Sequence, residues 1–264
     1  MSEMFGEIFS PENFLELTDL ITNDHLELGK FNVRLWRGQS DIEWPLDSGA
    51  YRKIQKQPSP FGPFKFSDEK RVRTHEENLL KQARHKGYGE ELGRKLSDVE
   101  LLARLQHHGA ATRFVDFSKN ALVSLWFCVQ ANEDKTGLLL GLSTDGIGGS
   151  YEDEFEEQTY NELVENLEKY DYPFFVETPV VTKRIAAQHG VFLYSEVVNS
   201  KKGSLKLDKA DSKNIYIAID PTLKAIARQV LSQVYDIRAA TLFPDIDGFS
   251  MLHSVNSSEK LHRW

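Results

Sequence analysis

The segment from Leu105 to Phe127 constrains the fold most, because three different structural patterns follow one another within it. A helical pattern ends before Gly109, and glycine is the residue that most often ends a helix. The next residues are interpreted as an extended strand, which would place Thr112, Phe114, Asp116 and Ser118 on one side and Arg113, Val115 and Phe117 on the other. The apolar segment that follows predicts a helix buried on most sides. The segment therefore indicates a protein that combines strands with helices.

Helical and extended patterns recur along the chain, but they do not alternate regularly, which disfavours a doubly wound parallel sheet. We expect an α+β domain with a split, mostly antiparallel sheet flanked by helices. The predicted helices cover 11–28, 68–86, 97–107, 119–131 and 221–235, and the predicted strands cover 31–37, 136–142, 174–180, 190–198 and 214–219, with a turn before 190. Ser97 and Glu100 have the spacing of a capping box at the start of one of these helices.

The chain is interpreted as one domain over residues 1–264, with its core at about 31–248 and two peripheral segments. Residues 55–66 are rich in proline, glycine and phenylalanine and predict an ordered loop, and residues 150–170 predict an acidic helical insertion after a glycine-rich join. A length of 264 residues is enough to bury a large core in one such domain.

The composition excludes several classes of protein. No apolar stretch approaches the roughly 20 residues that span a bilayer, and Cys128 is the single cysteine, so we expect a soluble, cytoplasmic protein with a buried thiol and no membrane partner. The formal net charge of −8 argues against a protein that coats nucleic acid through bulk electrostatics. It leaves open a local groove for nucleic acid, where the bases clustered between Arg52 and Lys95 would serve.

A first polar cluster lies at the end of the strand predicted for 31–37. Gly38 lacks a side chain, which lets a ligand approach the backbone, and the Arg37 guanidinium beside it is suited to grip a phosphate or carboxylate. Gln39 and Ser40 add hydrogen-bonding groups at the same rim. A structural ion pair of Arg37 remains the alternative.

A second polar cluster surrounds Gly109. Adjacent histidines point in different directions and have no partner at zinc-ligand spacing, so we predict no metal here and interpret His108 as a neutral group that hydrogen-bonds a ligand hydroxyl. Asp116 and Ser118 are further candidates, although both are also placed to cap the next helix. Ser118 lacks the context of a nucleophile elbow, so a serine hydrolase is not expected.

Polar residues in the last third of the chain form a third set. Arg184, Gln188 and His189 precede the strand predicted at 190–198. Asp245 and Asp247 are compatible with a metal pair or with a cap of the terminal helix, and the cap is favoured.

Three blocks of the sequence resemble the FRG family, which takes its name from an aromatic-Arg-Gly motif. Trp36-Arg37-Gly38 is similar to that motif. The segment Gln106 to Ser118 resembles the family signature, with His108 in place of the usual aromatic residue and Ser118 in place of the usual threonine. Residues Arg184 to Phe192, followed by Leu242-Phe243-Pro244-Asp245, resemble a third block. Members of this family often look like bacterial defence or toxin proteins, and the resemblance by itself implies no reaction.

A second resemblance, to ADP-ribosyltransferases of the Arg-Ser-Glu type, does imply one. Trp36-Arg37-Gly38 is similar to their first motif, and Asp116-Phe117-Ser118 leading into the apolar helix is similar to their second. In this resemblance Arg37 binds the pyrophosphate of NAD and Ser118 supports the nicotinamide side. Gln188, Glu196 and Asp245 all remain candidates for the group that orients the ribose hydroxyl or the nucleophile.

The sequence thus leads to an NAD-dependent ADP-ribosyltransferase of toxin or phage-defence type, with NAD as co-substrate. The expected catalytic residues are Arg37, His108, Asp116, Ser118 and Gln188, and the expected NAD-binding residues are Arg37, Gly38, Gln39, Thr112, Arg113 and Ser118.

The sequence leaves open whether the acceptor is nucleic acid, protein or a small molecule. A toxic enzyme would also need an antitoxin partner to restrain it. Two other classes remain: a non-catalytic sensor of a nucleotide or phage component, and a magnesium-dependent nuclease that uses His108, Asp116 and Asp245.

Overall fold

A computed structural model describes residues 4–27, 33–56, 66–91, 93–144, 147–149, 159–177, 183–207 and 213–254. Its elements, in chain order, are α1 (Phe14–Glu27), β1 (Arg34–Gln39), α2 (Gly49–Gln55), α3 (Asp68–His85), β2 (Glu90–Glu91), β3 (Arg94–Lys95), α4 (Asp98–His107), β4 (Val115–Ser118), α5 (Ala121–Val129), β5 (Gly137–Ser143), β6 (Gly148–Gly149), α6 (Tyr160–Lys169), β7 (Phe174–Val176), α7 (Lys183–Ala187), β8 (Gly190–Tyr194), β9 (Ile215–Ile219), α8 (Pro221–Gln233), α9 (Ala239–Leu242) and α10 (Ile246–Leu252).

The main sheet has the strand order β6-β7-β8-β4-β1-β5-β9, and every neighbouring pair is antiparallel except β6 with β7. This confirms the expected α+β class with a mostly antiparallel sheet. Strand β1 pairs with β5 along its whole length, whereas β1 and β4 are joined by one residue pair, Trp36 with Ser118. The sheet is therefore nearly divided between β4 and β1.

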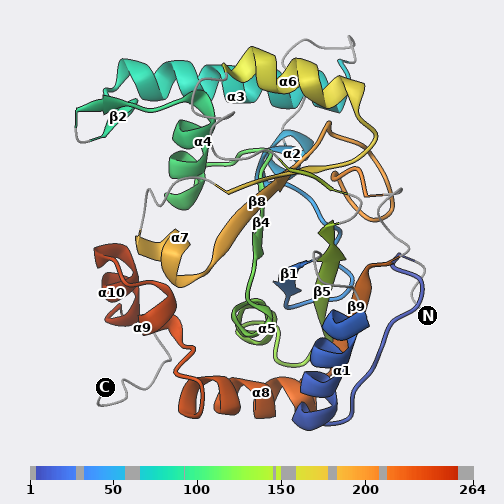
Figure 1. The fold of residues 1–264 in the computed structure, drawn as a ribbon. Helices are drawn as coiled ribbons and strands as arrows, with labels where there is room; N and C mark the ends of the chain where they lie inside the picture. Colours follow the sequence, from blue (N-terminus) through green and yellow to red (C-terminus); the bar gives the residue numbers. More distant parts are fainter. Residues whose placement is uncertain are drawn as a thin grey trace.

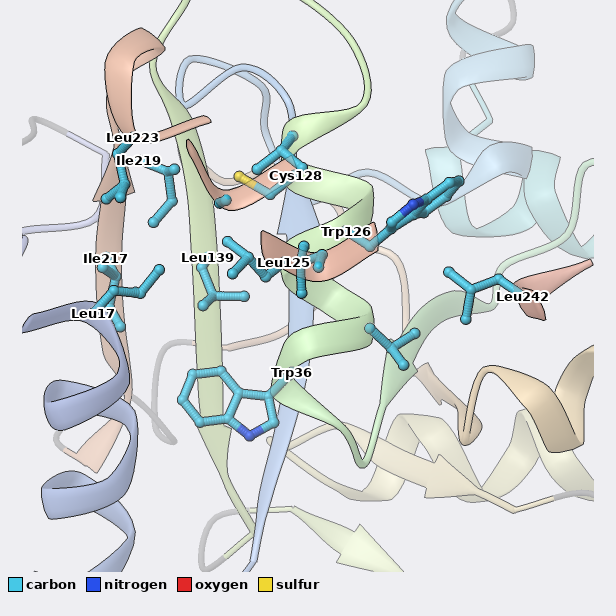
Figure 2. Close-up of a cluster of buried hydrophobic side chains, with 14 of the residues drawn as sticks. Leu17, Trp36, Leu125, Trp126, Cys128, Leu139, Ile217, Ile219, Leu223 and Leu242 are labelled. Carbon is cyan, nitrogen blue, oxygen red and sulfur yellow. The ribbon is translucent and has the colours of Figure 1, made fainter. Parts of the chain in front are cut away.

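The side chains of strand β5 pack into apolar clusters on both faces of the sheet. Leu139 points into one apolar cluster, whereas Leu138 and Leu140 point into another on the opposite face. Because both faces are covered, the strand is a continuous apolar run rather than an alternating one. Figure 2 shows the first cluster, in which α5 packs against β1 and β5 and Leu17 of α1 lies beside Ile217 of β9; α8 also packs against α5. Cys128 is buried in this cluster, as expected.

A second group of helices packs around the other half of the sheet. Helices α3 and α6 lie side by side at one end of the molecule (Figure 1), and α4, which precedes β4 in the chain, packs against α3. The capping box predicted for α4 is present, with Ser97 and Glu100 each bonding the other's backbone N–H. Helices α9 and α10 lie beside α7 (Figure 1), so the end of the described chain returns to the gap between β4 and β1.

The five predicted long helices and the predicted strands all appear, with shifted ends. The turn expected before 190 is instead helix α7, and the strand expected at 190–198 ends at Tyr194. Helices α2 and α9 and the short hairpin β2–β3 were not predicted. The expected loop at 55–66 falls mostly, and the start of the acidic insertion wholly, outside the described residues, while α6 lies within the predicted insertion. In the described segments, no helix has the length and apolar character that crossing a membrane requires.

Candidate functional site

A cavity of about 320 Å³ lies at the gap between β1 and β4. Its walls come from β1, the end of α4, β4, α5, α7, the start of β8 and the residue that follows α9. These segments carry all three sequence blocks, so the fold brings residues from 36 to 243 to one place. The volume is in the range typical of small-molecule sites.

Arg37 spans the gap in the sheet. Its Nη1 donates a hydrogen bond of 2.6 Å to the backbone carbonyl of Asp116, and its Nε donates to Gln39 Oε1 at 3.4 Å. The guanidinium also lies 5.9 Å from the ring centre of Phe117. Its Nη2 has no hydrogen bond or ion pair with any described residue. The two hydrogen bonds from Nη1 and Nε therefore fix the side chain, while Nη2 can still donate to a ligand. Burial lowers the pKa of Arg37 from its ordinary value, but arginine stays a cation at neutral pH.

Asp116 is the one carboxylate among the described residues that line the cavity. Its side chain is exposed, and Oδ1 accepts a hydrogen bond of 2.6 Å from Gln106 Nε2. The cavity therefore places a fixed cation and a fixed carboxylate in the same pocket.

The structure places His107, not His108, on the cavity wall. The side chain of His107 is 7% exposed, and its Nε2 lies 3.5 Å from Asp245 Oδ2. Burial, followed by the charges of Arg184 and His108, lowers the pKa of His107, so this imidazole is neutral at neutral pH. His108, the residue chosen from the sequence, lies outside the cavity lining: its side chain is 57% exposed and its Nδ1 lies 3.7 Å from Asp247 Oδ2.

Asp245 anchors the end of the described chain to α7. Its two oxygens accept hydrogen bonds of 3.0 and 2.8 Å from Arg184, and Oδ1 also accepts one of 2.8 Å from the N–H of Gly248 in α10. The bond from Arg184 is the main reason that the pKa of Asp245 falls to about 2. The capping hypothesis for Asp245 is thus supported. Over the described ranges, no three His, Cys, Asp or Glu residues converge on a possible metal position.

Ser118 and Gln188 line the cavity, but each is bonded to the backbone. The Ser118 hydroxyl donates to the carbonyl of Gln188 at 2.7 Å and accepts from the N–H of Asn120 at 3.0 Å. The Gln188 amide donates to the carbonyl of Leu242 at 3.0 Å. Gln39 lies behind Arg37 and donates to the carbonyl of Trp44 at 2.8 Å. These three side chains therefore support the pocket walls.

Three other candidates lie outside the cavity lining. Thr112 is 1% exposed and donates its hydroxyl hydrogen to Gln106 Oε1. Arg113, expected from the sequence to bind NAD, is also 1% exposed, and its guanidinium bonds Glu76 in a buried network. Glu196 pairs with Lys206 at 3.2 Å.

The aromatic wall of the cavity was missed by sequence reasoning. Phe127 of α5 and Phe243 after α9 line it, and their ring centres are 6.2 Å apart. Gln106 and His107 were visible only as members of the family signature. No local pattern marks an apolar residue as a pocket wall, because helix packing and ligand contact require the same side chains.

Gly38 lines the cavity, but packing explains its lack of a side chain. A Cβ there would collide with the carbonyl oxygen of Ser124 and lie 2.7 Å from the N–H nitrogen of Cys128, both in α5. We expect Gly38→Ala to lower the free energy of unfolding by about 3 kcal/mol, since an overpacked core forces backbone shifts. Urea denaturation measures this. Gly190→Ala is the matched control on the same cavity, because its Cβ would make an ordinary contact of 3.6 Å; equal losses in both variants would contradict the packing explanation.

The fold and the cavity define an α+β protein with a ligand-sized polar and aromatic pocket at a break in its sheet. Comparison with protein families shows that residues 32–137 match the FRG domain, which supports the resemblance to that family. The match covers the first two sequence blocks, and the third lies beyond it. Neither a search of curated proteins nor a search of solved structures found a match.

Proposed function

We propose that the protein is an NAD-dependent ADP-ribosyltransferase. The observation that carries this proposal is the Arg37 guanidinium, which is fixed by two acceptors and keeps Nη2 without a partner among the described residues, in one cavity with the Asp116 carboxylate. A planar guanidinium with spare donors suits the two oxygens of a phosphate. Phe127 and Phe243 offer apolar faces to a flat ring such as nicotinamide.

In this reaction the bond between the nicotinamide nitrogen and ribose C1′ breaks, and nicotinamide leaves as a neutral ring with the bonding electrons. Positive charge develops on the ribose, and the acceptor then attacks C1′ and loses a proton. Asp116 is assigned the carboxylate role that the sequence left open among Gln188, Glu196 and Asp245. Its negative charge stabilises the charge that develops on the ribose.

Gln188 and Asp245 are less suited to that role because of their partners. The Gln188 amide donates to a backbone carbonyl, and both Asp245 oxygens are taken by Arg184. The neutral imidazole of His107 takes the place that the sequence assigned to His108 as a hydrogen-bonding group for a ligand hydroxyl. A protein or nucleic acid remains the proposed acceptor, in a toxin or phage-defence setting with a restraining antitoxin.

A sensor that binds a nucleotide without chemistry is the second candidate. It is favoured by the backbone bonds of Ser118 and Gln188, which commit two of the expected catalytic side chains to holding the pocket. Such a sensor would bind NAD or another nucleotide without releasing nicotinamide. A nuclease is not favoured, because His108 lies outside the cavity that contains Asp116, and Asp245 is occupied by Arg184.

The test is release of free nicotinamide from NAD, with cell extract or single-stranded nucleic acid as the acceptor. We expect Arg37→Ala to weaken NAD binding by about 10- to 100-fold, which corresponds to the loss of a charge-assisted hydrogen bond or two. Arg37→Lys keeps the charge and loses the planar fork, so we expect it to recover only part of the binding.

Arg228→Ala is the matched control, because Arg228 is also a partly buried arginine that donates to a backbone carbonyl, that of Val129, but lies outside the cavity. It should bind NAD and release nicotinamide as the unmodified protein does. Nicotinamide release that is unchanged in Arg37→Ala would refute the role of Arg37. Nucleotide binding without any release would favour the sensor.

A further inference from the structure

We infer that Thr112 and Gln106 are positioning residues that fix the orientation of the Asp116 carboxylate in the pocket. The catalytic consequence rests on the proposed function, whereas the hydrogen-bonded chain that carries the inference does not. Neither Thr112 nor Gln106 is required to touch the substrate.

The chain has one direction of hydrogen bonding. The backbone N–H of Phe114 donates to the Thr112 hydroxyl oxygen at 3.3 Å, and that hydroxyl donates its own hydrogen to Gln106 Oε1. Gln106 Nε2 then donates to Asp116 Oδ1 at 2.6 Å. A backbone N–H can only donate and an ionised carboxylate can only accept. The carboxylate end thus requires the Gln106 amide to turn its NH₂ group toward Asp116, which leaves Gln106 Oε1 facing the Thr112 hydroxyl as its acceptor.

The two residues that form this chain are held firmly by their surroundings. Thr112 is 1% exposed, and its backbone carbonyl accepts a hydrogen bond of 2.8 Å from Ala50. Gln106 lies in the last turn of α4, whose first turn is fixed by the capping box of Ser97 and Glu100. The amide is therefore presented to the pocket from a fixed position.

Asp116 is held at its backbone as well as at its side chain. Arg37 donates to its carbonyl oxygen, and strand β4 pairs Asp116 with Phe192 of β8. Because Gln106 occupies Oδ1, the second oxygen, Oδ2, has no partner among the described residues and is left for the substrate. Without the Thr112 hydroxyl, Gln106 Oε1 loses its hydrogen-bond donor, so the amide is free to rotate and no longer holds the carboxylate in one orientation.

The kinetic test compares Thr112→Val, which keeps the shape and loses the hydroxyl, with Thr112→Ser, which keeps the hydroxyl. We expect Thr112→Val to lower kcat about 10- to 100-fold, in line with losses from misplaced catalytic groups, and to leave the Kd for NAD within about 3-fold, because Arg37 lies outside the chain. Thr112→Ser should restore kcat. A rise in Kd equal to the fall in kcat, or an equal loss in Thr112→Ser, would overturn the inference.

Gln106→Glu provides a second variant in case Thr112→Val does not fold. It keeps an acceptor for Thr112 and replaces the donor to Asp116 by a like charge, so kcat should fall while the Kd for NAD changes little. Full kcat in Gln106→Glu would contradict the inference.

A second measurement does not depend on catalysis. The side-chain amide of Gln106, followed by ¹H–¹⁵N NMR, should exchange slowly with water and show a proton shifted downfield by its bond to the carboxylate. Thr112→Val should abolish both the slow exchange and the downfield shift, and Thr112→Ser should keep both. An amide unchanged in Thr112→Val refutes the chain. If the amide behaves as expected but no protein sample releases nicotinamide, the proposed function fails and the positioning of Asp116 stands.

Discussion

Replacing Arg113 by methionine is expected to lower the free energy of unfolding by about 3 to 5 kcal/mol, because it leaves a buried carboxylate without its cation. Arg113 is 1% exposed and Glu76 is fully buried. Glu76 accepts hydrogen bonds of 2.6 Å from the backbone N–H of Arg113 and 2.7 Å from its Nε. The Tyr160 hydroxyl donates to the same carboxylate at 2.7 Å and accepts from Arg113 Nη2 at 2.9 Å.

The network joins three separate parts of the fold, since Glu76 lies in α3, Arg113 precedes β4 and Tyr160 begins α6. Burial alone would lower the pKa of Arg113, but the adjacent Glu76 carboxylate raises it above its ordinary value. Burial and the same carboxylate raise the pKa of Tyr160. At neutral pH Arg113 is therefore a cation and Tyr160 a neutral phenol.

Urea denaturation measures the loss, and Arg73→Met is the matched control in α3. Arg73 likewise pairs with a carboxylate, Glu69, at 2.7 Å, but the Arg73 side chain is 23% exposed. We therefore expect Arg73→Met to lower the free energy of unfolding by about 1 kcal/mol or less. The double variant Arg113→Met with Glu76→Leu should be more stable than Arg113→Met, because no unpaired charge is left. If Arg113→Met lowers the free energy of unfolding no more than Arg73→Met does, the network contributes little to stability.

Replacing Asp116 by asparagine is expected to lower kcat for nicotinamide release about 100- to 1000-fold, the size of effect seen when one electrostatic stabiliser is removed. The asparagine oxygen can still accept from Gln106, so the side chain keeps its position and loses only its charge. The Kd for NAD should change little, since Arg37 bonds the backbone carbonyl of residue 116 rather than its carboxylate.

Asp236→Asn is the control for the loss of one negative charge. Asp236 pairs with Arg238 outside the cavity and has a positive φ of 54°, a conformation that asparagine tolerates well, so its kcat should equal that of the unmodified protein. Steady-state release of nicotinamide, together with calorimetric titration of NAD, separates the two parameters. A normal kcat in Asp116→Asn would remove Asp116 from the mechanism.

These two variants affect positions only three residues apart, and the sequence treated both residues as site candidates. The structure separates the two residues: Asp116 of β4 lines the cavity, whereas Arg113, just before β4, bonds Glu76 of α3 and Tyr160 of α6. Sequence alone does not distinguish the two, since an arginine that binds a ligand and an arginine that binds a buried glutamate are the same residue type. The partner of Arg113, Glu76, lies 37 positions away in the chain.

Much of the fold was predictable from local patterns. The α+β class, the mostly antiparallel sheet and the five long helices follow from hydrophobic periodicity and from caps such as Ser97, which depend on neighbouring residues. The short elements α2, α7 and α9 were missed because segments of four to seven residues carry too little periodicity to be recognised.

The candidate site was predictable only as a set of segments. Arg37, Asp116, Ser118 and Gln188 do meet in one cavity, whereas His108, Thr112 and Arg113 do not line it. The choice between the adjacent histidines shows what sequence patterns cannot predict, which is the direction in which a side chain points. His107 and His108 are equivalent in a pattern, and only the direction in which α4 ends turns one ring to the cavity and the other to solvent.

The sequence by itself determined the five long helices, the longer strands, the class of fold and the segments that carry polar chemistry, because periodicity, caps and turn residues act over a few positions. The tertiary structure decided which polar groups face the cavity and which are buried in structural roles. Lys224 illustrates the reason: it lies in an ordinary helical pattern, yet its amine donates to the carbonyls of Ser40 and Asn132 at 2.7 and 2.9 Å and is fully buried. The role of a buried polar side chain depends on its hydrogen-bond partners, and the partners of Lys224 are distant in the chain.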